Sequence, residues 1–281
     1  MLIVRLSSSE NNNRQMRNLI QTLGVEDKVK YIIINSYKRS IADYLKTALL
    51  VLRSILDFRS TRIFIGNLHS GFLSIIARCY SRERVILIDD GSRTILLQKL
   101  FNDNYFYNLF TIYKIRPIKG QMVYKNSLEA TRKIIKSVKL CEDSILFIGS
   151  KISEINIVSE EYYFQLLVDI FQQYSAKNII YIPHREEKQS KVEKIGSISN
   201  VSIEKINYPV EMIGMYKDKI PKKALSFYST ALLTMKKLYG IEVKSCYFNY
   251  ESSIYKNDID TIYSFYAKEL EMKSYGCKEK K

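Results

Sequence analysis

The chain has 281 residues, a net charge of +15, 46% hydrophobic residues, ten glycines and four prolines. This composition excludes low-complexity and collagen-like classes, and the length allows two packed domains. The four cysteines are scattered without a CxxC pair, which argues against a zinc ribbon or a disulfide framework and fits a reducing compartment. The amino terminus reads as a first strand rather than a signal peptide, and the apolar stretch 48–56 is too short to span a bilayer.

The positive charge is concentrated in the first half. Residues 1–138 hold 23 Lys and Arg against 10 Asp and Glu, whereas 139–281 hold 21 against 19. Such a half attracts nucleic acid, an anionic membrane surface or an anionic acceptor, although the charge can also serve solubility alone. No basic cluster with interleaved aromatics indicates nucleic-acid binding. We therefore expect a cytoplasmic protein that binds peripherally to the anionic inner leaflet, with these candidate contacts: Arg14, Arg17, Lys114, Arg116 and Lys119.

Strands and helices alternate along the first half. Strands are predicted over 2–6, 29–34, 63–65 and 85–88, and helices over 14–23, 41–58, 70–79 and 93–101. This alternation predicts a parallel sheet with right-handed crossovers, whose polar strand ends gather on one rim. Residues 102–140 are less regular, with a helix over 128–138 leading out of the domain, so the boundary is placed near 138.

The second half repeats the alternation. Strands are predicted over 144–148, 178–182, 202–206, 224–228 and 242–248, and helices over 159–174, 231–238 and 259–272. The predicted fold class is therefore α/β, with two Rossmann-like domains, 1–138 and 139–281, facing each other across a cleft as in the GT-B architecture.

The most distinctive stretch is the apolar strand 85–88 followed by Asp89-Asp90-Gly91-Ser92. The carboxyl end of such a strand is where an open α/β sheet places its chemistry. Gly91 allows a sharp turn, and Ser92 is expected to cap the next helix. The alternative is a solvated turn, since Asp-Gly is a common turn pair. Ser8 and Asn67 follow two other strands and are expected at the same rim.

Two further strand ends carry candidate ligand-binding groups. His184 follows the strand 178–182 through Pro183, and Arg185 next to it favours an anion, although a plain surface loop is the alternative. Ser229-Thr230 lies where a strand becomes a helix, a position suited to binding phosphate; the alternative is a plain helix cap, although a cap can also bind a phosphate. The other histidine, His69, is expected to be structural or solvated.

Together these residues resemble the motifs of bacterial GT-B sialyltransferases. Asp89-Asp90-Gly91 matches the two-acids-and-glycine motif, Ser229-Thr230 matches the serine-threonine motif, and His184 matches the His-Pro motif except that Arg185 replaces the proline. The segment from Tyr181 to Glu186 is most similar to glycosyltransferase family 52, the lipooligosaccharide and capsule sialyltransferases, with the polysialyltransferases as neighbours. The resemblance spans about 66–238.

The resemblance implies an inverting transfer of sialic acid from CMP-sialic acid to a galactose-ended glycan. Asp89 would be the general base in an acceptor domain, and His184 would be the general acid or hydrogen-bond donor to the CMP phosphate in a donor domain. The other residues assigned to the donor are Ser229, Thr230, Gly149, Glu211 and Arg185, and those assigned to the sugars are Asp90, Asn67, Ser92 and Ser8.

Because the leaving group, CMP, has a single phosphate, the resemblance implies that the reaction requires no metal and no other cofactor. The implied acceptor is lipid-linked, and a homodimer is left open. Two other readings remain: a GT-B transferase using a different nucleotide sugar, and a non-catalytic glycan-binding protein.

Overall fold

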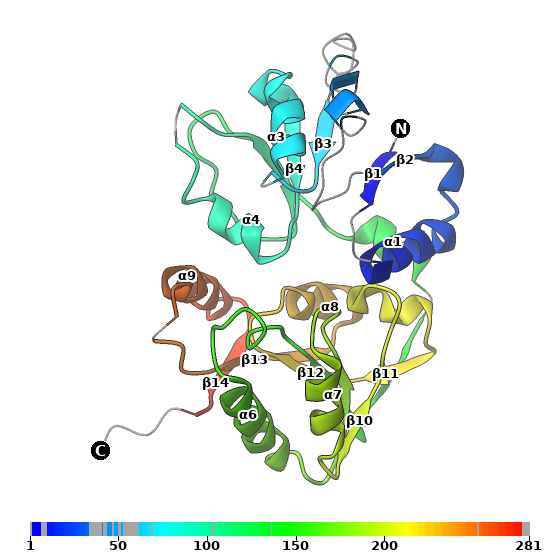
Figure 1. Cartoon of the computed structure of the whole chain (residues 1–281), viewed down its shortest axis with the longest axis vertical. Helices are drawn as coiled ribbons and strands as arrows, with labels where there is room; N and C mark the ends of the chain where they lie inside the picture. The colour runs from blue at the N-terminus through cyan, green and yellow to red at the C-terminus, as the bar shows by residue number, and fades with distance from the viewer. Residues whose placement is uncertain are drawn as a thin grey trace. The chain divides into compact units, whose positions relative to one another are not determined.

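The computed structural model describes residues 2–6, 10–33, 62–68, 70–102, 104–135, 137–251 and 253–276, together with isolated positions between 41 and 52. The chain divides into two compact units, Met1–Ser127 and Leu128–Lys281 (Figure 1). The predicted helix 41–58 falls mostly outside the described residues, as do Ser8 and His69.

Unit 1 contains two parallel sheets in its described part. One pairs β1 (Leu2–Leu6) with β2 (Val29–Ile33), and α1 (Glu10–Thr22) and a short 3-10 helix, η1 (Glu26–Lys28), connect them. The other sheet has four parallel strands in chain order: β3 (Ile63–Ile65), β4 (Val85–Ile88), β5 (Asn108–Thr111) and β6 (Val123–Lys125). Helices α3 (Gly71–Arg78) and α4 (Ser92–Leu97) flank β4 in sequence.

The apolar run before Asp89 forms a central strand whose first three residues are buried, as predicted, whereas Ile88 is 39% exposed. Val85, Ile86 and Leu87 are at most 3% exposed, and β4 lies between β3 and β5. The expected single rim is only partly correct, because β1 pairs with β2 and with none of the other described strands. Asn67 and Asp89 do follow neighbouring strands, since β3 and β4 are paired in register.

Unit 2 is built on a six-stranded parallel sheet in the order β10-β9-β8-β12-β13-β14. The strands are β8 (Ser144–Ile148), β9 (Asn178–Ile182), β10 (Val201–Ile203), β12 (Lys223–Ser226), β13 (Glu242–Tyr247) and β14 (Glu271–Ser274). The helices are α6 (Glu160–Gln172), α7 (Gln189–Gly196), α8 (Ala231–Tyr239) and α9 (Lys256–Tyr266). A separate pair joins β7 (Lys139–Cys141) to β11 (Lys219–Pro221).

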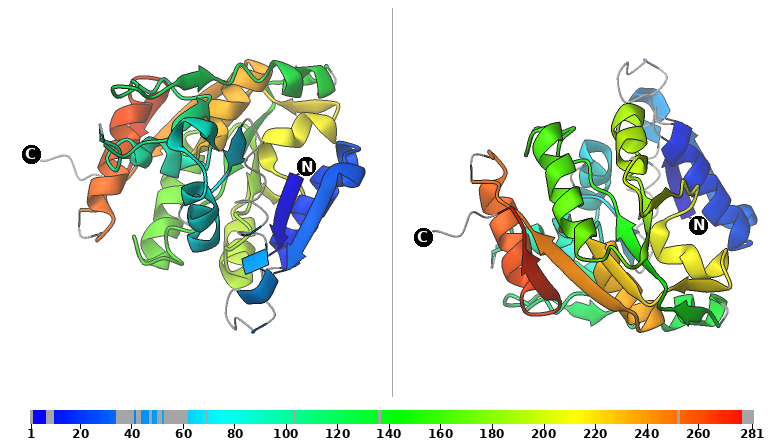
Figure 2. Two further views of the ribbon diagram at one scale, coloured as in Figure 1. Left: turned by 90° about the horizontal axis from the view of Figure 1, so that it is seen from above. Right: turned by 90° about the horizontal axis from the view of Figure 1, so that it is seen from below.

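Helices cover both faces of this sheet. Figures 1 and 2 show α6 and α7 on one face and α8 on the other. Alternate residues of β8 point to opposite faces, and Phe147 packs edge-on against Phe171 of α6. The parallel sheets of both units, each connected by helices, confirm the predicted α/β class with two Rossmann-like parts of the kind that make up a GT-B fold.

Several boundaries differ from prediction. The units divide at 127/128 rather than near 138, because α5 (Glu129–Ile134) and the residues after it pack on unit 2, where Ile135 and Val138 lie against Gly214. The predicted helix 259–272 ends at Tyr266, and its last part is the edge strand β14, paired with β13. The irregular region 102–140 contains the short strands β5, β6 and β7.

Candidate functional site

The strand order of unit 2 defines where a ligand binds. From β8 the chain moves outward through β9 to β10, and from β12 it moves the other way through β13 to β14. Neighbouring strands β8 and β12 therefore form a topological switch point, the position outside the carboxyl ends where open α/β sheets hold their ligands. Gly149 follows β8, His184 follows β9, and Ser229-Thr230 follows β12, so the sheet brings three predicted elements to adjacent strand ends.

Ser229-Thr230 forms the turn from β12 into α8, as predicted. Thr230 is the N-cap residue in helical conformation, and the Ser229 hydroxyl accepts a hydrogen bond from the Ala231 N–H at 3.3 Å. Both residues are half-buried. The amino terminus of this nine-residue helix therefore carries two hydroxyls at the switch point, an arrangement suited to a phosphate.

Gly149 is held in a space too small for any side chain. A Cβ at this position would lie 2.3 Å from Glu187 Oε2 and 2.6 Å from the Tyr181 hydroxyl. The Gly149 N–H also donates to the Ile182 carbonyl at 2.8 Å. The glycine thus lets the chain leaving β8 lie directly against the end of β9.

We expect Gly149→Ala to lower the free energy of unfolding by about 1–3 kcal/mol, as overpacking of a tight site does. The ring of Tyr181 is fully buried and cannot swing away. Gly71→Ala is the control, because nothing lies within 4 Å of a Cβ there, and it should be neutral or slightly stabilising. Chemical denaturation of both variants measures the difference, and equal stabilities would contradict the close approach at Gly149.

His184 is half-buried in a tight turn after β9. The Glu187 N–H donates to the His184 carbonyl at 2.9 Å, and the Glu186 N–H donates to His184 Nδ1 at 3.2 Å. Because Nδ1 accepts a hydrogen bond, the proton of the neutral ring is assigned to Nε2. This tautomer leaves an Nε2–H donor for a ligand.

Burial lowers the pKa of His184 to about 4, while Glu186 raises it and Arg185 and Lys151 lower it further. The ring is therefore neutral at pH 7. The unfolded chain takes up the proton near pH 6.5, so this residue's contribution to stability is complete above that pH and is lost as the pH falls toward 4.

We expect up to about 3 kcal/mol of stability to depend on this single protonation, at 1.4 kcal/mol per pKa unit. Urea denaturation between pH 4 and pH 7 should show a steeper loss of stability for the wild type than for His184→Gln. Parallel curves for the two proteins would contradict a depressed pKa.

Arg185 and Glu211, both predicted to bind the donor, lie near enough for the charge of Arg185 to act on the Glu211 carboxylate. Glu211 lies half-buried on the short 3-10 helix η3 (Val210–Met215), where burial raises its pKa and the charge of Arg185 opposes that shift. The Arg185 side chain is exposed, with its Nε 3.9 Å from Glu186 Oε1. The Glu211 carbonyl accepts from the Tyr239 hydroxyl at 2.7 Å.

Three charged residues near His184 were missed by the sequence analysis. Lys151 follows β8, two residues after Gly149, and its Nζ lies 2.5 Å from Glu186 Oε2. Glu187 and Lys191 form a buried ion pair below the His184 turn, with Nζ 2.8 Å from Oε1. The i,i+4 spacing of Glu187 and Lys191 could have indicated this ion pair, although residues with that spacing more often form a pair on the surface of a helix.

Asp89 lies in unit 1, at the end of β4. Its Oδ1 accepts from the Thr111 hydroxyl at 2.5 Å and its Oδ2 accepts from the Ile112 N–H at 2.8 Å. Burial raises the pKa of Asp89, and these hydrogen bonds partly oppose the rise. A carboxylate oxygen has a second lone pair, so this half-buried, oriented and more basic carboxylate can still accept a proton from a substrate.

The other unit 1 candidates have local structural partners. Gly91, rather than Ser92, is the N-cap of α4, because its φ of 57° suits glycine and no side chain caps this helix. The Asp90 N–H donates to Thr94 Oγ1 at 2.8 Å. Asn67 Oδ1 accepts from the Ser70 N–H at 3.1 Å, just before α3. Ser8 lies outside the described residues.

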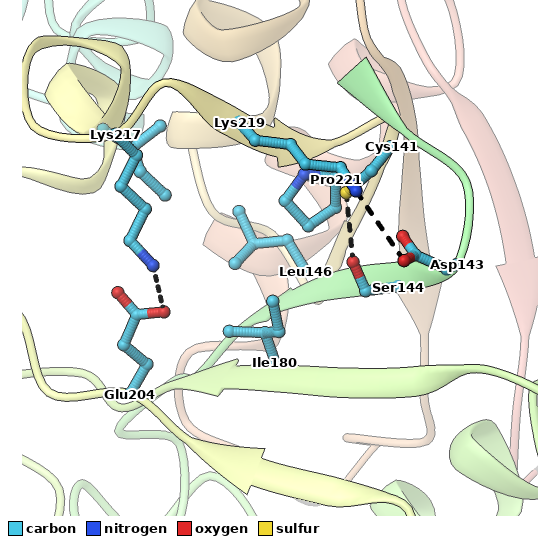
Figure 3. Close-up of a pocket in the computed structure, with 10 residues that line it drawn as sticks. Cys141, Asp143, Ser144, Leu146, Ile180, Glu204, Lys217, Lys219 and Pro221 are labelled. Atoms are coloured by element: carbon cyan, nitrogen blue, oxygen red, sulfur yellow. Dashed lines mark hydrogen bonds and ion pairs between the residues drawn. The ribbon is translucent and has the colours of Figure 1, made fainter. Parts of the chain in front are cut away.

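A pocket of about 220 Å³ in unit 2 contains none of the predicted site residues (Figure 3). Its walls include Leu146 and Ile180 from the face of the sheet, with Lys217 paired to Glu204 at one side. Ser144, the first residue of β8, also lines it, so the pocket reaches the amino-terminal end of that strand. Among the described residues, no group of three His, Cys, Asp or Glu side chains is placed to hold a metal ion.

Residues 114–248 match the family model of alpha-2,8-polysialyltransferases (POLYST). The matched segment contains Gly149, His184 and Ser229-Thr230 but not Asp89. No curated protein matches the chain.

Similar solved structures share 10–11% sequence identity with the chain. Acinetobacter baumannii MurG has a TM-score of 0.46 at 10% identity, covering 97% of this chain and 85% of its own. Arabidopsis thaliana UGT89C1 complexed with UDP-L-rhamnose has a TM-score of 0.49 at 11% identity, covering 96% and 77%. E. coli heptosyltransferase WaaC with ADP has a TM-score of 0.40 at 11% identity, covering 97% and 92%.

The family match and the strand-end residues agree within unit 2. The matched segment runs through the switch point and includes the His184 turn and the Ser229-Thr230 turn at neighbouring strand ends. Over residues 114–248, the chain is therefore similar to the alpha-2,8-polysialyltransferase family.

Proposed function

We propose that the protein is an inverting sialyltransferase that moves sialic acid from CMP-sialic acid to a galactose-ended glycan. The observation that carries the proposal is the placement of Gly149, His184 and Ser229-Thr230 at three neighbouring strand ends around the switch point of unit 2. The family match over the same segment supports a sialic acid donor. Within this class, lipooligosaccharide and capsule sialyltransferases of family 52 are the group we propose.

In this mechanism unit 2 binds the donor. The hydroxyls of Ser229 and Thr230 at the start of α8 and the Nε2–H of His184 donate to the phosphate of CMP. Negative charge grows on that phosphate as the bond to the anomeric carbon breaks, so these donors stabilise the transition state. Because the pKa of His184 is about 4, it acts as a neutral hydrogen-bond donor rather than a cationic acid.

Unit 1 supplies the base. Asp89 takes the proton from the acceptor hydroxyl as its oxygen attacks the anomeric carbon, and CMP leaves from the opposite side with inversion. Thr111 and the Ile112 N–H hold the carboxylate, and burial makes it more basic. Neither step requires a divalent metal in this proposal, because a single phosphate leaves and protein donors bind it.

The proposal is tested by incubating the protein with CMP-sialic acid and a panel of galactosides, in the presence and absence of a chelator. Release of CMP together with a sialylated product supports it, since CMP release alone would also follow from hydrolysis. Inhibition by the chelator would contradict metal independence. Release of UDP or GDP from other donors would favour a different nucleotide-sugar transferase, and binding without turnover would favour a non-catalytic glycan-binding protein.

We also propose that unit 1 brings the enzyme to a lipid-linked acceptor on an anionic membrane. No helix in the described part of the chain is long and apolar enough to span a bilayer. Residues 1–127 hold 20 Lys and Arg against 9 Asp and Glu, a net charge of +11, and each Lys or Arg near an anionic surface contributes about 1 kcal/mol.

We therefore expect the protein to co-sediment with vesicles containing phosphatidylserine at low salt and to dissociate as salt rises, because charge interactions are screened beyond about 8 Å at physiological ionic strength. Neutral phosphatidylcholine vesicles are the control. Equal binding to both kinds of vesicle, or none at low salt, would leave the charge with a role in solubility or acceptor binding.

A further inference from the structure

A buried charged network lies beneath the His184 turn and is not used in the mechanism above. The Lys191 side chain on α7 is only 1% exposed, and the Glu187 side chain is fully buried. Nζ of Lys191 is 2.8 Å from Glu187 Oε1 and 2.9 Å from Glu154 Oε2, and it lies 4.1 Å from the centre of the Tyr163 ring. A buried ion pair of this kind need not stabilise the fold, so its position beneath the His184 turn points to a role other than stability.

The Glu187 carboxylate connects the buried network to the site. Its Oε2 accepts from the His184 N–H at 2.6 Å. Its Oε1 accepts from the Tyr181 hydroxyl at 2.7 Å and from the Tyr163 hydroxyl at 3.3 Å. Since the Glu187 N–H also donates to the His184 carbonyl, residue 187 holds both backbone polar groups of His184.

The same carboxylate lies between the ends of β8 and β9, beside the switch point. Oε2 lies 2.3 Å from the Cβ position of Gly149, so Glu187 occupies the space between the ends of β8 and β9. The Tyr163 hydroxyl accepts from the Ser150 N–H at 3.2 Å, which ties the loop after β8 to the same group. The loops after β8 and β9, which carry Gly149 and His184 of the proposed donor site, thus share one buried anchor.

We propose that Glu187 is a positioning residue for His184, and that Lys191 keeps its carboxylate in place as the anchor of the His184 turn. This inference rests on the proposed function for its effect on transfer. The anchoring itself depends only on the hydrogen bonds and the ion pair of the Glu187 carboxylate. With the turn held, the Glu186 N–H stays on Nδ1 and the Nε2–H stays directed to a ligand.

The first test is Glu187→Gln, which keeps the volume and removes the charge. The amide must place its NH2 group either against the His184 N–H or against the ammonium of Lys191, and both are contacts between donors. We expect the His184 amide to exchange with solvent at least ~10-fold faster, while amides within β9 stay protected. We expect turnover to fall by ~10²-fold, as for a misplaced catalytic group.

A double variant, Glu187→Gln with Lys191→Met, provides the rescue. Without the ammonium, the amide oxygen can accept from the His184 N–H while the NH2 group donates to the Tyr181 hydroxyl. Slow exchange at the His184 amide and most of the turnover should return. A double variant that behaves like Glu187→Gln alone would overturn the role given to Lys191.

Two controls separate positioning from general stability. Glu154→Gln removes a carboxylate that also contacts Lys191 but does not touch His184, and Glu193→Gln makes the same change on the exposed side of α7. Both should leave the exchange rate of the His184 amide unchanged. The same acceleration in Glu154→Gln, or wild-type exchange and CMP affinity in Glu187→Gln, would overturn the proposal.

The design also separates this inference from the proposed function. If the wild type transfers no sialic acid, the proposed function fails, and amide exchange at His184 still decides whether Glu187 anchors the turn. If the wild type is active and Glu187→Gln keeps its full rate with a folded His184 turn, the positioning role alone fails.

Discussion

Asp89→Asn should abolish most sialyl transfer while leaving the fold and CMP binding intact. A general base contributes ~10²–10⁴-fold in rate, and an amide cannot take the proton from the acceptor hydroxyl. Asparagine can keep the local contacts, since its oxygen can accept from the Ile112 N–H and its NH2 group can donate to Thr111 Oγ1. The measurement is initial rates of product formation alongside CMP titration by calorimetry.

Two control variants test the choice of Asp89 over its neighbour. Asp90→Asn makes the same chemical change one residue along, and Thr111→Val removes one hydrogen bond to Asp89 without changing its charge. We expect both to keep more activity than Asp89→Asn. If Asp90→Asn loses transfer while Asp89→Asn retains it, Asp90 is the base and Asp89 serves to join the ends of β4 and β5.

His184→Ala should lower turnover and CMP affinity together. One hydrogen bond to a charged phosphate contributes about 1.5–3 kcal/mol, so its loss should raise the dissociation constant of CMP by ~10–100-fold. Because charge on the phosphate grows in the transition state, kcat/KM for CMP-sialic acid should fall at least as far as the affinity for CMP, and kcat should fall by the excess. Calorimetry with CMP and steady-state kinetics give the two quantities.

Two amide substitutions identify which ring nitrogen faces the ligand. Glutamine places an N–H near the position of Nε2, and asparagine places one near Nδ1. Since Nδ1 accepts from the Glu186 N–H, His184→Gln should keep more CMP affinity than His184→Asn. The reverse order would mean that the ring is turned the other way in the complex, and unchanged affinity in all three variants would remove His184 from the site.

The sequence alone determined the local part of the site. The apolar run before Asp89 predicted a buried strand ending in two carboxylates, and β4 is that strand. The stretch before Ser229 predicted a strand-to-helix turn, and α8 begins two residues later, at Ala231. These predictions succeed because hydrophobic periodicity and helix-start signals depend on neighbouring residues. The strands β5 (NLFT), β7 (KLC) and β11 (KIP) have at most two consecutive apolar residues, so they lack the unbroken apolar run that predicted β3 (IFI) and β4 (VILI).

Only the tertiary structure decided how these pieces come together. The switch point depends on the pairing of β8 with β12. The paired residues, Leu146 of β8 and Ala224 of β12, are far apart in the chain. The support of Asp89 comes from Thr111 in the next strand of the sheet. Strand order and such long-range hydrogen bonds arise from the global packing of the sheet, which no local pattern encodes. The sequence analysis likewise identified His184 but not the buried carboxylate of Glu187 that holds it. A glutamate in a charged segment is normally exposed. The burial of Glu187 depends on Lys191, Tyr181 and Tyr163, which close around it only in the folded structure.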